Sequence, residues 1–261
     1  MKQINDLLDA KLIEEHKLKE KRNYLGASML GDECIRKVQL QYMKHDANFS
    51  AQNLRTFDIG NCLESLIFKW MIFAGFDLRV RNENGKQFGF SIANGKIAGH
   101  CDGIIFGFPP ELKSNKFDML SSSISFASVE QSAIHTGEII GSMPQALWEC
   151  KTMNNKNWND TAKRGVLVSK PTYYVQVQLY MAYLNLDENP CLFTALNKDT
   201  SEVYHEFIPF DAETAQKYSD RAVQIIKATE SNELLPRLSN DSSHFKCKMC
   251  GFRNVCWGDA Q

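Results

Sequence analysis

The residues most able to do chemistry are one aspartate and a closely spaced glutamate and lysine. Glu149 and Lys151 are two positions apart in the apolar run 146–152. In a strand such residues point to the same face, so an anion and a cation would lie side by side, with Cys150 on the other face. Asp102 ends a second predicted strand, 99–102, and its carboxylate can converge on Glu149 if the strands are neighbours. Carboxylate pairs suit hard cations such as Mg²⁺ or Mn²⁺, so we predict a metal site.

A second Glu-x-Lys triplet, Glu111-Leu112-Lys113, competes with the first. Such triplets are weak signals alone, since exposed strands often pair these charges. Two prolines precede Glu111 directly, and proline cannot donate to a central sheet ladder. Apolar residues typical of a buried strand precede Glu149 instead. We therefore select Glu149 and Lys151.

The cysteines form two groups. Four lie singly in apolar segments, where buried structural thiols are the ordinary interpretation: Cys62, Cys101, Cys150 and Cys191. Cys247, Cys250 and Cys256 instead cluster near the end of the chain. In a reducing compartment this spacing favours metal ligation over disulfides. Three thiolates require a fourth ligand, and spacing does not separate zinc from an iron–sulfur cluster.

The elements that must position these residues follow from hydrophobic periodicity. We predict helices at 3–22, 60–74, 172–186 and 212–231, of which 3–22 packs on the main body or a partner and 60–74 is largely buried. We predict strands at 87–92 and 96–106, joined across Asn94-Gly95, and at 146–152, 191–197 and 202–207. This order indicates a mixed α/β domain without internal repeats.

Residues 107–143 fit none of these elements, because they contain Pro109-Pro110, a serine run and little periodicity. We interpret them as an insertion that is either a lid or substrate guide or a disordered loop. The expected organisation is a single domain, 1–261. It comprises an N-terminal helix at 1–25, a core at 26–240 with the insertion, and a cysteine-rich segment at 241–261.

Three motifs together resemble the PD-(D/E)XK nuclease superfamily and, more narrowly, its RecB-like exonuclease branch, including phage-encoded members. They are Gly-His-Cys-Asp102, Trp-Glu-Cys-Lys-Thr152 and Gln176-Val-Gln-Leu-Tyr180. The resemblance implies a restriction-endonuclease-like core with a central mixed sheet flanked by helices. It also implies that Asp102, Glu149 and the backbone carbonyl of Cys150 bind the metal, and that Lys151 is the catalytic lysine.

The same resemblance suggests further site residues. Gln176 and Tyr180, on one helical face, would position the substrate strand and the lysine. Gly60-Asn-Cys-Leu-Glu64 resembles an upstream helical element of the family, which makes Glu64 a metal ligand; a solvated helix glutamate is an equal alternative. Lys170 is a candidate for substrate binding. The connection from Asp102 to Glu149 is longer than is usual in the family.

Residues 28–36 resemble the N-terminal element of iron–sulfur RecB-like nucleases, which include the AddB type and CRISPR adaptation exonucleases. These proteins also carry the C-x2-C-x5-C spacing of Cys247, Cys250 and Cys256. The resemblance therefore implies a [4Fe-4S] cluster bound by these residues and Cys34, with Zn²⁺ as the alternative. The cluster would be a structural clasp between the N- and C-terminal segments.

Composition limits the partners. Lysine and arginine total 30 against 31 acidic residues, so a DNA-binding surface must be local. The basic run 151–170 is one candidate, or else a solvated helix face. Its neighbours Trp158, Tyr173 and Tyr174 could stack bases, although core packing is the more common role. Apolar runs are too short to span a membrane, and no secretory signal is evident. We expect the cytoplasm of a prokaryote or phage-infected host.

These observations favour a Mg²⁺- or Mn²⁺-dependent DNA nuclease, in particular an exonuclease that acts on single strands or free ends. One alternative is a catalytically silent DNA-binding or scaffold protein on the same fold. The other is a restriction-type endonuclease, for which only the shared fold argues.

Overall fold

The computed structural model describes residues 2–19, 21–45, 47, 49–113 and 145–258. Its central sheet contains β2 (Asp77–Arg79), β5 (Gly103–Gly107), β6 (Ala146–Met153), β7 (Cys191–Asn197) and β8 (Val203–Ile208), in that order. The β6–β7 pair is parallel and the other pairs are antiparallel. The predicted mixed α/β class is thus confirmed, and so are the strands at 146–152, 191–197 and 202–207.

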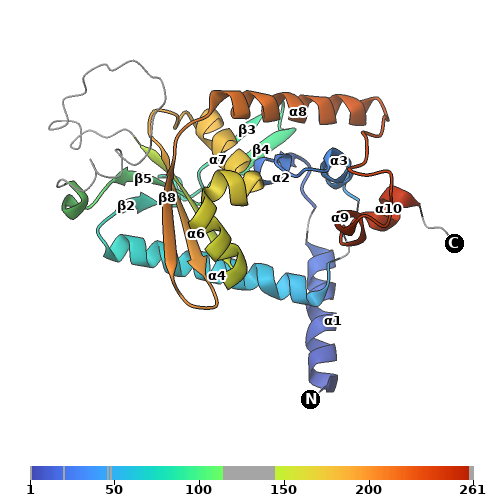
Figure 1. Ribbon diagram of the computed structural model, residues 1–261, viewed down its shortest axis with the longest axis horizontal. Helices are drawn as coiled ribbons and strands as arrows, with labels where there is room; N and C mark the ends of the chain where they lie inside the picture. Colours follow the sequence, from blue (N-terminus) through green and yellow to red (C-terminus); the bar gives the residue numbers. More distant parts are fainter. Residues whose placement is uncertain (1, 20, 46, 48, 114–144, 259–261) are drawn as a thin grey trace.

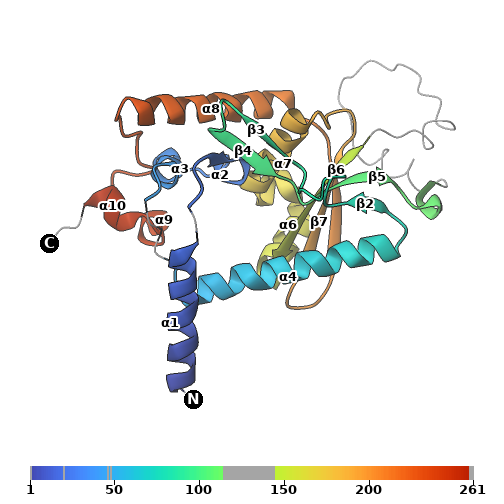
Figure 2. The same ribbon diagram turned by 180° about the vertical axis from the view of Figure 1, so that it is seen from behind.

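Helices cover both faces of this sheet (Figures 1 and 2). Alternate residues of β6 serve the two layers, as expected for a buried strand. Trp148 and Cys150 pack with Ile67 and Met71 of α4 (Ala51–Phe73). Leu147 belongs to the other core cluster, to which α7 (Pro171–Leu184) and α8 (Ala212–Glu230) contribute. α6 (Asn155–Ser169) packs beside α7.

A smaller sheet contains β1 (Leu25–Gly26), β4 (Ile97–His100) and β3 (Gly89–Ile92), in that order. β3 and β4 form the predicted antiparallel hairpin, whose turn places Asn94 at φ 54° and Gly95 at φ 80°. The prediction of a single strand at 96–106 is wrong, because this stretch forms two strands, β4 and β5. The chain pairs with β3 as far as His100, the N–H of Cys101 adds one more bond to the carbonyl of Phe88 at 3.1 Å, and from Gly103 the chain pairs within the central sheet instead.

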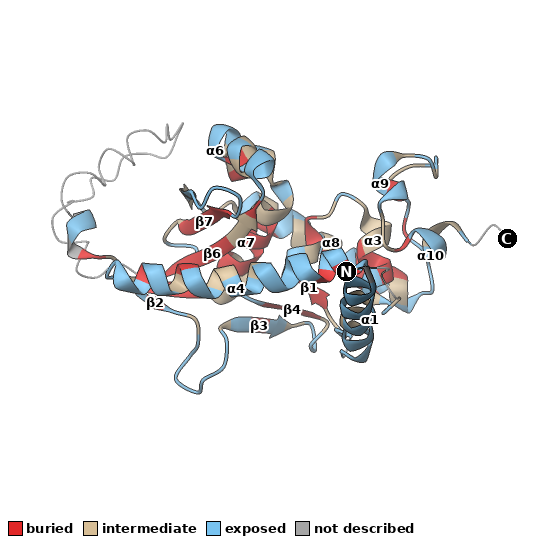
Figure 3. Cartoon of the chain, turned by 90° about the horizontal axis from the view of Figure 1, so that it is seen from below, coloured by how far each residue is buried: buried red, intermediate tan, exposed pale blue. Residues whose placement is uncertain are grey.

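The helix predicted at 60–74 is part of α4, which begins earlier, after a Ser50–Asn53 capping box. The prediction that it is largely buried is wrong. The exposed apolar side chains of this stretch include Leu66 at 38%, Trp70 at 41% and Phe73 at 85% relative exposure. Figure 3 shows the exposed face of α4 along its length. The sheet covers only one stripe of the helix, so apolar composition alone overestimated its burial.

The N- and C-terminal elements meet at one end of the molecule (Figure 1). They are α1 (Lys2–Leu18), α3 (Ile35–Tyr42), α9 (Phe245–Lys248) and α10 (Arg253–Trp257), while α2 (Ala27–Leu30) lies further inward, against α7. α1 contacts α4, where Arg55 pairs with Asp9. Buried Gln39 of α3 joins the two ends of the chain: its amide donates to the carbonyl of Glu233 at 2.7 Å and accepts from the N–H of Leu235 at 2.8 Å.

The predicted insertion lies largely outside the described residues, which stop at 113 and resume at 145. Its described beginning holds the end of β5 and a short 3-10 helix, η1 (Pro110–Lys113). Glu111 is therefore on an exposed helical turn and not in the sheet. Among the described helices, none combines the length and apolar character needed to cross a membrane.

Candidate active site

The strands that carry Asp102 and Glu149 are neighbours, as the predicted convergence of the two carboxylates requires. β5 pairs antiparallel with β6, with Gly103 opposite Trp148. Asp102, directly before β5, accepts a 2.8 Å hydrogen bond at Oδ2 from the backbone N–H of Cys150. Lys151 Nζ donates to Glu149 Oε1 and lies 3.5 Å from Asp102 Oδ2. The structure thus brings the three predicted catalytic residues together.

The carboxylate of Glu149 is fully buried, and one of its two oxygens, Oε2, lacks a hydrogen bond. Burial, followed by repulsion from Asp102, raises its pKa to about 8 in spite of Lys151. An unsatisfied buried carboxylate oxygen is costly, which is why such groups mark sites of function or of an absent ligand. Oε2 is therefore an available ligand atom for a cation.

Glu64 is brought to the same place by α4. The helix passes close to β6 at Gly60, where a Cβ would lie 3.6 Å from Thr152 Oγ1. Burial and then repulsion from Asp102 raise the pKa of Glu64 to about 7. Three carboxylates, from Glu64, Asp102 and Glu149, therefore interact around the single ammonium of Lys151. Such a surplus of negative charge favours binding of a divalent cation.

α7 supports this site through Gln176 and Tyr180, both buried. The amide of Gln176 donates to Glu149 Oε1 and so fixes the carboxylate that carries the open Oε2. The ring of Tyr180 lies against Gly99 of β4, where a Cβ would be 2.5 Å from the ring. Only glycine allows this close approach, which explains why the run before Asp102 begins with Gly99.

Asp102, Glu64, Gln176 and Tyr180 line a cleft of about 460 Å³. Its lining also contains polar residues that sequence reasoning did not select: Arg22, Tyr24, Ser28, Asn61, Ser65, Gln87 and His100. Asn61 and His100 lie within quoted motifs and could have been found there. Arg22 and Tyr24 carry no local signal, because their place depends on pairing between β1 and β4.

The basic run 151–170 forms α6 and its flanks, and its side chains are partly engaged. Lys170 donates to Asn157 Oδ1 at 2.9 Å, and Arg164 pairs with Asp160 at 2.6 Å. Lys170 does not appear among the described residues that line the cleft. The indole of Trp158 donates to the carbonyl of Ala195 at 3.0 Å. It packs against the core, as do the nearby tyrosines Tyr173 and Tyr174, so these aromatics serve packing.

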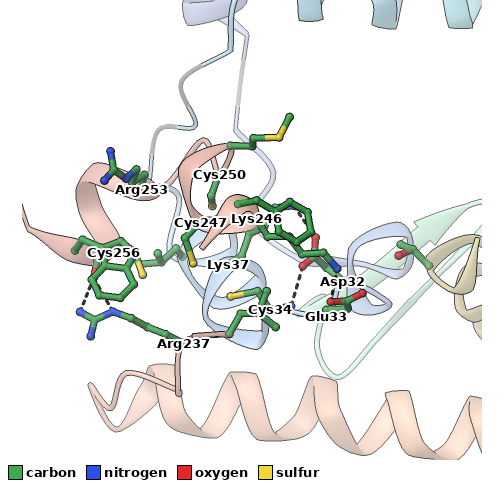
Figure 4. A pocket seen from close by; sticks show the side chains of 16 residues that line it. Asp32, Glu33, Cys34, Lys37, Arg237, Lys246, Cys247, Cys250, Arg253 and Cys256 are labelled. Carbon is green, nitrogen blue, oxygen red and sulfur yellow. Dashed lines mark hydrogen bonds and ion pairs between the residues drawn. The ribbon is translucent and has the colours of Figure 1, made fainter. Parts of the chain in front are cut away.

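The cysteines separate as predicted, with one exception. Cys34, Cys247, Cys250 and Cys256 surround one cavity of about 310 Å³ (Figure 4), although Cys34 is remote in sequence. Burial, and then the thiols of Cys34 and Cys256, raise the pKa of Cys247. Of the other four, Cys101, Cys150 and Cys191 are buried. Cys62 is exposed on α4, so the prediction of a buried thiol there is wrong.

Within the part of the chain that the structure describes, no group of three or more His, Cys, Asp or Glu side chains is arranged so that it could hold a metal ion. At the carboxylates, Lys151 neutralises charge where a cation would act. At the cysteines, the four thiols border a shared space. The donor types fit the two predicted groups: oxygen atoms for Mg²⁺ or Mn²⁺, and sulfur atoms for a cluster or zinc.

The fold has relatives among solved structures. No family model and no curated protein matches the sequence. An alkaline exonuclease from Laribacter hongkongensis, LHK-Exo, is similar, with 14% identity over 81% of this chain and 90% of that chain, and a TM-score of 0.50. Its complex with dAMP gives 0.51 at the same identity and coverage. The structure of SSO0001 is 16% identical over 99% of this chain and 98% of that chain, with a TM-score of 0.48. The similarity to the alkaline exonuclease confirms the predicted fold, a mixed sheet flanked by helices as in a nuclease.

Proposed function

We propose that this chain, which has the fold of an alkaline exonuclease, is a metal-dependent nuclease that hydrolyses DNA phosphodiester bonds at Asp102, Glu149 and Lys151. The observation that carries the proposal is the buried Oε2 atom of Glu149, which has no hydrogen-bond partner and lies beside a second carboxylate and a lysine. A purely structural ion pair rarely leaves a buried carboxylate oxygen without a hydrogen bond, because that costs free energy. A site that must bind a cation requires such an atom.

The residues have separate tasks in this proposal. Asp102 and Glu149 bind Mg²⁺ or Mn²⁺, with Glu64 and the Cys150 carbonyl as further ligands. The bound ion neutralises phosphodiester charge and lowers the pKa of a water nucleophile. Lys151 supplies a fixed positive charge for the negative charge that develops on the phosphate oxygens. Gln176 holds Glu149 in place through its hydrogen bond, and Tyr180 packs α7 against the strand before Asp102.

A single strand with a free end is the substrate that we favour. The RecB-like motifs support an exonuclease, and the structure of LHK-Exo in complex with dAMP is consistent with a site that takes one nucleotide. Lys170 would contact the strand outside the cleft. Of the alternatives, the silent binding protein does not account for Lys151 beside the two carboxylates, because metal binding without turnover needs no catalytic lysine. A restriction-type endonuclease has no specific support.

The proposal is tested with end-labelled single- and double-stranded DNA in the presence of Mg²⁺ or Mn²⁺. Wild type should degrade the DNA, and Asp102→Ala should not. Equal degradation by both proteins would mean that the activity does not arise at this site. Circular DNA then separates the two modes of cleavage, since an exonuclease needs an end.

We also propose that Cys34, Cys247, Cys250 and Cys256 bind a [4Fe-4S] cluster that clasps the N- and C-terminal segments of a single domain, with 26–240 as the core between 1–25 and 241–261. The four thiols line one cavity, which supports a group that all four of them bind. The resemblance of residues 28–36 and of the C-x2-C-x5-C spacing to iron–sulfur nucleases favours a cluster over the alternative, Zn²⁺. A reducing, cytoplasmic compartment suits the free thiols.

A further inference from the structure

A second cavity, of about 590 Å³, lies at the end of α1. We call it the basic groove. It is bordered by α1, by the connection from α1 to β1, and by the segment that follows α3. Its lining contains five lysine or arginine residues, Lys17, Lys19, Lys21, Arg22 and Lys44, and two histidines, His16 and His45. None of the described residues that line it is Asp or Glu.

Two of these lysines have partners among the described residues. Lys19 pairs with Glu15 at 3.3 Å, and Lys21 donates to the carbonyl of Lys44 at 3.1 Å. Glu20 and Asp46 occur in the same stretches of sequence and lie outside the described residues. Even with these two acids counted, 16–22 and 41–49 hold more basic than acidic residues. The chain as a whole has a net charge of −1, so this surplus is local.

The groove adjoins the active-site cleft. Arg22 and Tyr24 line both cavities. Their position is fixed by β1, because the N–H of Leu25 donates to the carbonyl of Lys96 at 2.8 Å and β1 then runs parallel to β4. β4 leads directly to Asp102. Arg22 and Tyr24 therefore lie between the cleft and the basic groove, where a polymer that extends from one to the other would pass.

The groove also offers aromatic rings. Phe49 is exposed and meets His16 edge to face at 5.5 Å between ring centroids. Tyr24 is half-buried between the groove and the cleft, with the Arg22 guanidinium 5.9 Å from its ring centroid. Basic side chains that follow a backbone and aromatic rings that stack on bases are the combination used for single-stranded nucleic acid. Paired bases inside a duplex are not free to stack in this way.

We propose that the basic groove binds the single DNA strand that extends from the catalytic cleft, with Arg22 and Tyr24 guiding it from the cleft into the groove. This inference rests on the proposed nuclease function and assigns a path to its substrate. Lys17 and Lys44 contact phosphates in this account. Their loss weakens binding of long strands and leaves the chemistry at Asp102 unchanged.

The first test measures binding without metal, so that no cleavage occurs. Fluorescence anisotropy is recorded with a labelled single strand of about 20 nucleotides, longer than a typical single-strand site. The variant Lys17→Gln with Lys44→Gln is compared with the control Lys217→Gln with Lys227→Gln, two exposed lysines of α8. The groove variant should bind about tenfold more weakly. Its slope of log K against log salt should be shallower by about 1.4, or about 0.7 for each lost phosphate contact.

The second test measures cleavage as a function of length. The groove variant should have an increased KM for the long strand, with kcat unchanged, and should cleave a dinucleotide as wild type does. Wild-type protein that binds single strands but cleaves nothing would refute the nuclease function and leave the groove assignment standing. Equal affinity and equal salt slope in the groove and control variants would refute the groove. A larger loss of duplex binding than of single-strand binding would also refute it.

Discussion

The backbone N–H of Cys150 donates a 2.8 Å hydrogen bond to Asp102 Oδ2, which ties the residue before β5 to the middle of β6. This one contact places the Asp102 carboxylate beside both Glu149 and Lys151. It also means that Asp102 has a structural and a chemical role, which substitutions can separate.

Asp102→Asn keeps an acceptor for the Cys150 N–H and removes the charge. We expect the rate of cleavage to fall on the order of 10²- to 10³-fold. This loss corresponds to the several kcal/mol of transition-state stabilisation that a bound metal supplies. Metal-free stability should equal or exceed that of wild type, because repulsion from Glu64 and Glu149 is relieved. Asp102→Ala should cost about 1–3 kcal/mol through the unpaired N–H. Urea denaturation compares the two variants, and an Asp102→Asn protein that is fully active would exclude Asp102 as a ligand.

The raised pKa of Glu149, about 8 from burial and then Asp102, predicts a pH dependence. Between an ordinary carboxyl pKa and about 8, the native state holds a proton that the unfolded chain has released. The free energy of unfolding of the metal-free protein should therefore fall as the pH rises from about 5 to about 8. Glu149→Gln should show a smaller fall. Denaturation in EDTA at several pH values measures both, and parallel curves would contradict this assignment.

Gln176 and Gln178 are matched probes of positioning, since both are buried on α7. Gln176 donates to Glu149, whereas Gln178 accepts from the N–H of Asp211 at 2.7 Å and donates to the carbonyl of Pro209 at 3.1 Å. Gln176→Ala should weaken Mn²⁺ binding about 10- to 100-fold, as loss of a supporting hydrogen bond does. Gln178→Ala should cost about 1–3 kcal/mol of stability with unchanged Mn²⁺ affinity. Similar Mn²⁺ affinities in both variants would remove the positioning role of Gln176.

Cys34 and Cys62 provide the matched pair for the cluster. Cys34 lines the cavity with the C-terminal thiols, and Cys62 is exposed on α4. Cys34→Ala should abolish the brown colour and the bound iron and lower the thermal midpoint, because the two ends of the chain lose a crosslink. Cys62→Ala should retain all three. If wild-type protein purified without oxygen contains zinc and no iron, the alternative metal, Zn²⁺, is the correct one.

Much of the site was predictable because its signals are local. Two-residue spacing placed Glu149 and Lys151 on one face, and apolar context distinguished them from Glu111, which lies on a helical turn. The break after His100 was not predictable, since the apolar run continues through it and only the change of pairing partners, from β3 to β2 and β6, separates β4 from β5. The exposure of α4 was missed for a similar reason. Apolar side chains occur around the helix, and the sequence does not show which of them the sheet covers.

The partners of the site that come from distant parts of the chain were harder to predict. Arg22 and Tyr24 reach the cleft through the two-residue strand β1, which is too short to give a periodic pattern. Cys34 was found by resemblance to a family, since nothing in its own neighbourhood distinguishes it from a structural thiol. The basic run on α6 was the more obvious DNA-binding candidate, although the groove beside Arg22 is the basic surface that adjoins the cleft.

The most direct test of the central claim is metal-dependent cleavage of end-labelled single-stranded DNA by Glu149→Gln and by its matched control, Glu111→Gln. Each variant exchanges one carboxylate for an amide within a Glu-x-Lys triplet. We predict that wild type and Glu111→Gln release nucleotides when Mn²⁺ is added and not in EDTA. Glu149→Gln, although folded, should release none with Mn²⁺. Wild-type rates in Glu149→Gln, or cleavage by wild type that persists in EDTA, would contradict a metal-dependent active site at Glu149.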